Sequence, residues 1–90
     1  MNEMSLKERF NVAALVVKTL KKKPSDDEML KIYALYKQSI VGDCNTSQPG
    51  FFNMKEKAKW NAWRGVAGIT QQQAMIEYIQ MVEVLMEKYN

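Results

Sequence analysis

The sequence contains no histidine, a single cysteine and two prolines. Without histidine, the chain lacks the side chain that most often serves as general base or metal ligand near neutral pH. The lone thiol, Cys44, excludes an internal disulfide and is typical of a reducing compartment. It stands in a turn-rich segment with no base beside it, so we interpret it as an incidental small residue and not as a reactive thiol. We therefore expect no catalytic residues, no metal ligands and no cofactor.

Long apolar runs are also missing. No segment approaches the roughly 20 apolar residues of a membrane span, and the N-terminus is polar, with no hydrophobic signal region. We expect a cytoplasmic protein without stable membrane insertion. Ninety residues, of which 47% are hydrophobic and 26% charged, predict one folded domain covering residues 1–90.

The scarcity of proline and glycine permits long helices, and strand signals are thin. A helix-capping residue followed three positions later by glutamate or glutamine occurs four times, and each occurrence predicts the start of a helix. The four segments are Ser5–Glu8, Ser25–Glu28, Asn53–Glu56 and Thr70–Gln73. Four starts predict an all-α protein with four helices.

Apolar periodicity and helix-breaking residues set the expected helix ends. The first helix should run from about residue 5 to 20 and the second should end near Val41, before Gly42. The third is short and ends at Gly65 and Gly68, and the fourth follows Thr70. The segment 43–52 is a loop of turn-forming residues, long for a small bundle, and suits a crossover between helices that are not hairpin neighbours.

The net charge of +3 comes mainly from lysine, because only Arg9 and Arg64 are arginines. Lysine binds phosphate as a point charge, whereas arginine is the usual reader of base edges. The composition therefore favours a phosphorylated small ligand over sequence-specific DNA. The run Lys21–Lys23 has two readings: a solvated helix end, or a surface that attracts anions.

One face of the second helix mixes apolar, aromatic and charged side chains: Met29, Tyr33, Tyr36, Lys37 and Ile40. Since an unpaired buried ammonium is costly, Lys37 should have an anionic partner. On the third helix, Lys55 and Lys59 share a face with Trp63. Taken singly, such aromatic residues indicate packing and such lysines indicate ordinary surface. Together they suit a ligand with a stackable ring, several phosphates and an apolar part.

These motifs resemble the signature of the acyl-CoA-binding protein family, in the family's order and spacing, from Phe10 to Tyr89. The matching segments are Lys21–Pro24, Tyr33–Gln38, Val41–Asn45, Pro49–Gly50, Lys57–Trp63 and Ala74–Tyr78. Two positions depart from the pattern. Glu56 stands where relatives commonly have glycine, and Met54 where a larger or branched apolar residue is usual. We expect Glu56 to weaken the positive field around Lys55.

The resemblance implies a four-helix bundle with up-down-down-up topology, in which the long loop between helices two and three is the crossover. It also implies non-catalytic intracellular binding and transport of long-chain acyl-CoA thioesters by a monomer, with enzymes that use acyl-CoA as possible partners. By the same resemblance, Tyr33, Lys37 and Lys59 hold the 3′-phosphate of CoA and Tyr36 packs against adenine. Lys18 and Lys55 are flanking cations, Tyr78 is a wall of the site, and Met29 and Leu30 contact the acyl chain.

Two other classes of function compete with this reading. A small basic helical domain could bind nucleic acid, but ten carboxylates and the lack of a lysine-rich recognition helix argue against it. An interaction module for a membrane surface or a protein partner could use the methionines Met75, Met81 and Met86 as an adaptable groove. For the core, we expect Trp60 to be buried, so that its replacement costs stability.

Overall fold

The computed structural model describes residues 3–90, and over these residues it contains helices and no strand. The elements are α1 (Leu6–Val16), the 3₁₀ turn η1 (Val17–Thr19), α2 (Asp26–Ile40), α3 (Met54–Arg64) and α4 (Gln71–Tyr89). The all-α prediction is confirmed, and the predicted helix limits agree with the structure to within a residue or two, except at the end of the first helix. That helix was expected to reach about residue 20, but α1 ends at Val16 and the chain continues as the 3₁₀ turn η1. No helix in this range is both long and apolar enough to cross a membrane.

Serine and threonine caps start three of the helices, as predicted. At α2, the Ser25 hydroxyl accepts a hydrogen bond from the Glu28 N–H at 3.2 Å, and the Glu28 carboxylate accepts one from the Ser25 N–H at 2.8 Å. Ser5 and Glu8 form the same reciprocal pair at α1. Thr70 caps α4 through its hydroxyl alone, because the Gln73 amide donates to Glu77 instead. These bonds satisfy backbone donors that the first helical turn leaves free.

The cap predicted at Asn53 is wrong. Its side chain makes no capping hydrogen bond, and its backbone has φ −103° and ψ 73°. The Asn53 N–H donates to the Gly50 carbonyl at 3.0 Å, so the chain enters α3 directly from a turn. A side-chain cap normally requires an extended backbone at this position, and the turn prevents it.

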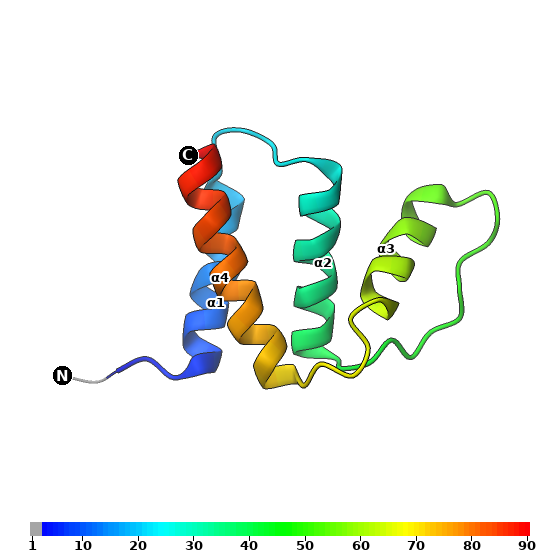
Figure 1. Cartoon of the computed structure of the whole chain (residues 1–90), viewed down its shortest axis with the longest axis horizontal. Coiled ribbons are helices and arrows are strands. Elements are labelled where there is room, and N and C mark those ends of the chain that lie inside the picture. The colour runs from blue at the N-terminus through cyan, green and yellow to red at the C-terminus, as the bar shows by residue number, and fades with distance from the viewer. Residues whose placement is uncertain (1–2) are drawn as a thin grey trace.

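The chain follows the predicted up-down-down-up path (Figure 1). Helices α1 and α2 run in opposite directions, and the long segment after α2 then travels back along the molecule so that α3 runs parallel to α2 (Figure 1). Helix α4 returns beside α1. As a result, the first turns of α2 and α3 lie at the same end of the molecule.

Helix α4 packs against both α1 and α2, whereas α3 packs against α2 alone. The main core lies between α1, α2 and α4, and its buried members are Phe10, Ala13, Leu35, Tyr78, Ile79 and Val82. A smaller cluster of Ala34, Trp63 and Val66 joins α3 to α2. Within residues 3–90, the backbones of α1 and α2 do not approach each other closely, and a cleft remains between the two helices with α4 as its floor.

The expectation that Trp60 is buried is wrong, because Trp63 is the buried indole, with 4% of its surface exposed. The Trp63 N–H donates to the Gly42 carbonyl at 2.8 Å, at the end of α2. Trp60 is half-buried and its N–H donates to the Thr46 carbonyl at 2.9 Å. Trp60 therefore fastens the crossover loop to α3, and Trp63 fastens α3 to α2.

Candidate functional site

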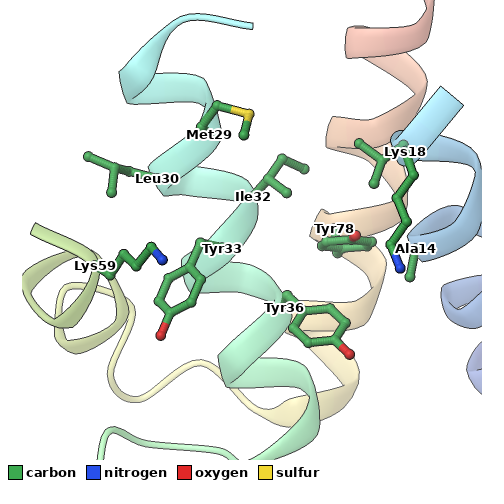
Figure 2. A pocket seen from close by; sticks show the side chains of 10 residues that line it. Ala14, Lys18, Met29, Leu30, Ile32, Tyr33, Tyr36, Lys59 and Tyr78 are labelled. Carbon is green, nitrogen blue, oxygen red and sulfur yellow. The ribbon is translucent and has the colours of Figure 1, made fainter. Parts of the chain in front are cut away.

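A cleft of about 520 Å³ opens between α1 and α2 (Figure 2). Its walls come from α1, η1, α2 and α3, and α4 supplies the floor. The lining residues are Ala14, Val17, Lys18, Met29, Leu30, Ile32, Tyr33, Tyr36, Lys59 and Tyr78. Seven of the nine residues predicted for the site are among them: Lys18, Met29, Leu30, Tyr33, Tyr36, Lys59 and Tyr78. Among residues 3–90, no carboxylate lines this cleft, and the charged groups that line it are the ammonium groups of Lys18 and Lys59.

The rings of Tyr36 and Tyr78 line the cleft and pack against the core ring of Phe10. The buried Tyr78 ring lies 4.9 Å from Phe10 and 6.0 Å from Tyr36, measured between ring centroids. Phe10 also stacks on Tyr36 at 5.7 Å, with an interplanar angle of 23°. Tyr36 remains exposed, so a ring held from behind by the core is available to a planar ligand.

Tyr78 adds an uncharged wall. Burial disfavours its phenolate form, and together with the neighbouring Tyr36 this raises the pKa of Tyr78 to about 12. The side chain is therefore neutral throughout the physiological range and does not repel an anion.

The two lysines of the cleft come from opposite walls (Figure 2). Lys59 of α3 extends toward Tyr33, and its Nζ lies 5.6 Å from the centroid of the Tyr33 ring. Lys59 also pairs with Glu56 at 3.7 Å, although both side chains are about half exposed. Such an exposed pair is weak. Glu56 is thus paired with Lys59. From the sequence we had expected Glu56 to act on Lys55.

Lys37 and Lys55 do not line the main cleft. Lys55 lines an adjoining hollow of about 340 Å³, which also includes Met54 and Ala58 and shares Met29 and Leu30 with the cleft. The Lys37 Nζ lies over the ring of the buried Trp63, 4.8 Å from its centroid. In the described part of the chain, Lys37 forms no ion pair. Its charge is therefore not neutralised by a carboxylate of residues 3–90.

A second adjoining hollow, of about 370 Å³, continues from the cleft at Lys18, Met29 and Ile32. Its rim includes all three lysines of the run Lys21–Lys23, and Leu20 and Leu85 contribute to its apolar part. The run is therefore placed beside the cleft, where it adds to the positive charge.

Sequence reasoning missed Ala14, Val17 and Ile32 as lining residues. Ala14 and Val17 belong to the apolar stripe of α1, and their spacing is equally typical of core residues. In the structure they are half-buried at the edge of that core. The sequence did contain a signal for these residues. Ala14 lies one turn before Lys18, Val17 directly precedes Lys18, and Lys18 marks the border of the apolar stripe.

The described residues include no group of three or more His, Cys, Asp or Glu side chains placed to hold a metal ion. The cleft thus offers a neutral aromatic platform, aliphatic walls and ammonium groups. This set of groups fits an anionic ligand that carries a planar ring and an apolar segment.

Comparisons with known proteins agree with this chemistry. The family model described as "Acyl CoA binding protein" matches residues 7–82. An acyl-CoA-binding protein of Gossypium hirsutum is 54% identical over 84 residues, which cover 93% of this chain and 94% of that protein. One from Saccharomyces cerevisiae is 48% identical, covering 90% of this chain and 93% of its own length. The crystal structure of Oryza sativa acyl-CoA-binding protein 2 is similar with a TM-score of 0.90 and 42% identity, over 93% of each chain.

Proposed function

The chain belongs to the acyl-CoA-binding protein family, and from this membership we propose that it binds and transports long-chain acyl-CoA thioesters without altering them chemically. The observation that carries the proposal is the cleft itself. No carboxylate of the described residues lines it, lysines enter it from two walls, and its exposed Tyr36 ring is backed by the core. The alternative of a basic interaction module as the main function is not favoured by these relatives.

The CoA nucleotide would occupy the tyrosine side of the cleft. Tyr33, Lys37 and Lys59 would hold the 3′-phosphate, since ammonium and hydroxyl groups form charge-assisted hydrogen bonds to phosphate. Two observations support this role: Lys59 already lies beside Tyr33, and Lys37 has no carboxylate partner among the described residues. The Tyr36 ring would stack on adenine, and Tyr78 would close the floor.

The acyl chain would follow the apolar wall toward the start of α2. Met29 and Leu30 line both the main cleft and the hollow that reaches Met54, so they connect the two spaces. Lys18 and Lys55 would stand at opposite sides of the ligand as flanking cations. Burying alkyl groups gains about 0.8 kcal/mol per methylene, so a palmitoyl chain contributes on the order of 10 kcal/mol before ordering costs.

The remaining features of the proposed carrier follow from the same chemistry. Residues 1–90 form one acyl-CoA-binding domain that needs no cofactor and no metal. It acts as a monomer in the cytoplasm, where its single thiol, Cys44, stays reduced. Enzymes that use acyl-CoA are its partners, and nucleic acid is not.

Calorimetric titration with palmitoyl-CoA, CoA and palmitate, each below its aggregation threshold, tests the proposal. We expect one-to-one binding of palmitoyl-CoA that is far tighter than binding of either fragment. CoA lacks the chain that fills the apolar wall, and palmitate lacks the phosphates that pair with the lysines. Equal and weak binding of all three compounds would overturn the proposed function.

A further inference from the structure

A second groove runs between α1 and α4, apart from the cleft. It consists of two adjoining hollows of about 400 Å³ and 210 Å³, which share Arg9, Ile79 and Glu83. The other lining residues are Met4, Leu6, Val12, Ala13, Val16, Ile76, Gln80, Val82 and Met86. None of the groove residues lines the cleft. The groove is therefore a separate surface, to which the proposed function assigns no role.

The groove and the cleft lie on different flanks of the α1–α4 pair. On α1, Ala13 lines the groove and Ala14 lines the cleft. On α4, Ile79 lines the groove and Tyr78 lines the cleft. Because an α-helix has 3.6 residues per turn, such consecutive residues point in directions about 100° apart. A molecule bound in the groove therefore leaves the cleft open.

The groove exposes apolar surface that no other part of residues 3–90 covers. Met4 is 53% exposed, Val12 is 43% exposed and Ile76 is 38% exposed. The lining residues follow the whole of α1, whose 11 residues span about 16 Å at 1.5 Å per residue. This length matches a helix of about three turns. An apolar furrow between two packed helices is a recurring seat for an amphipathic helix.

Carboxylates surround the groove. Glu83 lines it, and three further acids adjoin a lining residue in sequence. The four exposed acids are Glu3, Glu8, Glu83 and Glu87. Over residues 3–90, none of them forms an ion pair, and neither does Arg9, the cation that lines the groove. Four carboxylates against one guanidinium make this flank acidic, although the chain as a whole has a net charge of +3.

We propose that this groove docks a basic amphipathic helix of a partner protein. The apolar side chains of that helix rest on Val12, Val16 and Met86, and its lysines and arginines face Glu83 and Glu87. The unbranched Met86 adapts its shape to the apolar residues it meets. A second copy of this chain brings the same acidic rim, and an anionic lipid surface is also negative, so both are repelled. The lysines of the cleft flank repel a basic helix and so direct it to the groove.

The consequence for transport rests on the proposed function. Since the groove and the cleft share no lining residue, a partner helix and an acyl-CoA molecule bind at the same time. A partner that holds the α1–α4 flank leaves the mouth of the cleft free for release of the ligand. The partner chemistry that fits is an enzyme that uses acyl-CoA and carries an exposed basic helix.

A synthetic helical peptide tests the groove. The probe has about 14 residues, enough to cover the groove, with leucine on one face and lysine on the other. A matched peptide carries glutamate in place of lysine. Fluorescence anisotropy measures peptide affinity for the unmodified protein, alone and as its one-to-one complex with palmitoyl-CoA. Methyl chemical shifts locate the bound peptide.

Two pairs of variants separate the groove from the rest of the surface. Val12→Ser is compared with Leu15→Ser, which also removes an exposed apolar side chain of α1 but one that lines no hollow of the groove. E83K/E87K is compared with Glu77→Lys, which adds a positive charge to α4 outside the groove. Palmitoyl-CoA affinity is measured for every variant.

We expect the basic peptide to bind at least tenfold more tightly than the acidic one and to shift the methyl signals of Val12, Val16 and Ile79. E83K/E87K should lose at least tenfold in peptide affinity and Val12→Ser severalfold, whereas both control variants stay unchanged. The palmitoyl-CoA complex should bind the peptide within about threefold of the free protein.

The proposal is overturned if the basic peptide does not bind, if both peptides bind equally, or if the controls lose as much affinity as the groove variants. Displacement of the peptide by palmitoyl-CoA would place it in the cleft and also overturn the proposal. So would a dimer in sedimentation equilibrium that Val12→Ser dissociates, because the groove would then belong to a second copy. Palmitoyl-CoA affinity within about threefold in all variants keeps these outcomes distinct from a failure of the proposed function.

Discussion

The Lys37 Nζ lies 4.8 Å from the centroid of the Trp63 ring, on the side of α2 that faces α3. A cation held over an aromatic face is stabilised without being neutralised, so it stays able to pair with an anion. Among the described residues no carboxylate pairs with Lys37. The anionic partner expected from the sequence is therefore supplied, in the proposed function, by the ligand.

Replacing Lys37 should thus affect binding more than stability. We expect Lys37→Gln to weaken palmitoyl-CoA binding by about tenfold to a hundredfold, because a hydrogen bond to a charged group contributes about 1.5–3 kcal/mol. Calorimetric titration measures the affinity, and thermal unfolding should change little. Lys7→Gln, which changes an exposed lysine of α1 that does not line the cleft, is the matched control. Equal affinities of the two variants would contradict the phosphate role of Lys37.

Lys59 should behave similarly, although it starts from an ion pair with Glu56. We expect Lys59→Ala to weaken palmitoyl-CoA binding by more than about tenfold, because one of the charges next to Tyr33 is lost. Stability should fall only slightly, since an exposed ion pair contributes about 0–1 kcal/mol. The companion variant Glu56→Gln frees Lys59 from its partner and should bind at least as tightly as the unmodified protein. Weaker binding by Glu56→Gln would argue against a phosphate at this position.

Tyr36 is expected to act through its ring and not through its hydroxyl. Tyr36→Phe keeps the surface that stacks on Phe10 and should bind palmitoyl-CoA within about threefold of the unmodified protein. Tyr36→Ala removes the platform, and we expect a loss of about tenfold, in line with the roughly 1–3 kcal/mol of base–aromatic stacking. Titration with CoA alone should show the same ratio, because the acyl chain lies elsewhere. Equal losses in the two variants would instead assign the role to the hydroxyl.

Local sequence patterns predicted some of the helix caps and failed at another. The serine caps at α1 and α2 depend on residues three positions apart, so local pattern predicted them correctly. The cap at Asn53 failed because a turn bond from its N–H to Gly50 fixes the backbone in another conformation. Local pattern does not show whether the preceding chain is extended.

The residues of the site, too, could be predicted only in part. Helical spacing on α2 brought Met29, Tyr33 and Tyr36 together, and the family resemblance added residues from the other helices. Spacing did not distinguish Ala14 and Val17 in the cleft wall from core residues, because wall and core share one stripe of α1. The contact between Lys37 and Trp63 joins residues of different helices, and only the packing of α3 on α2 reveals it.

The two tryptophans of α3 should contribute unequally to stability. Trp60 was expected to be the buried tryptophan, but Trp63 is the one buried against α2, and its N–H donates to the Gly42 carbonyl. We expect Trp63→Ala to lower the free energy of unfolding by about 3–5 kcal/mol, the usual cost of deleting a large buried ring. Trp60→Ala should cost about 1 kcal/mol, since it loses mainly one hydrogen bond to the crossover loop. Urea unfolding followed by circular dichroism measures both, and the reverse order would contradict this assignment.

Acid should weaken the junction between the start of α2 and the end of α4. The Tyr89 hydroxyl donates to the Glu28 carboxylate, which also accepts from the Ser25 N–H and pairs with Lys88 at 3.0 Å. These contacts, with the Tyr89 bond as the largest cause, lower the pKa of Glu28 from 4.5 to about 2. A carboxyl group whose pKa is lower in the folded state stabilises the fold above its unfolded pKa.

The stabilisation by Glu28 is therefore complete above about pH 4.5 and disappears as the pH falls through its folded pKa of about 2. We expect the urea midpoint to decrease across this window, and Glu28→Gln to reduce that decrease because it removes the titrating group. Tyr89→Phe should give an intermediate slope, since Ser25 and Lys88 still favour the charged form. Glu87→Gln, an exposed neighbour in sequence to Lys88, is the control and should follow the unmodified protein. If Glu28→Gln and Glu87→Gln have the same pH profile, Glu28 does not account for the acid sensitivity.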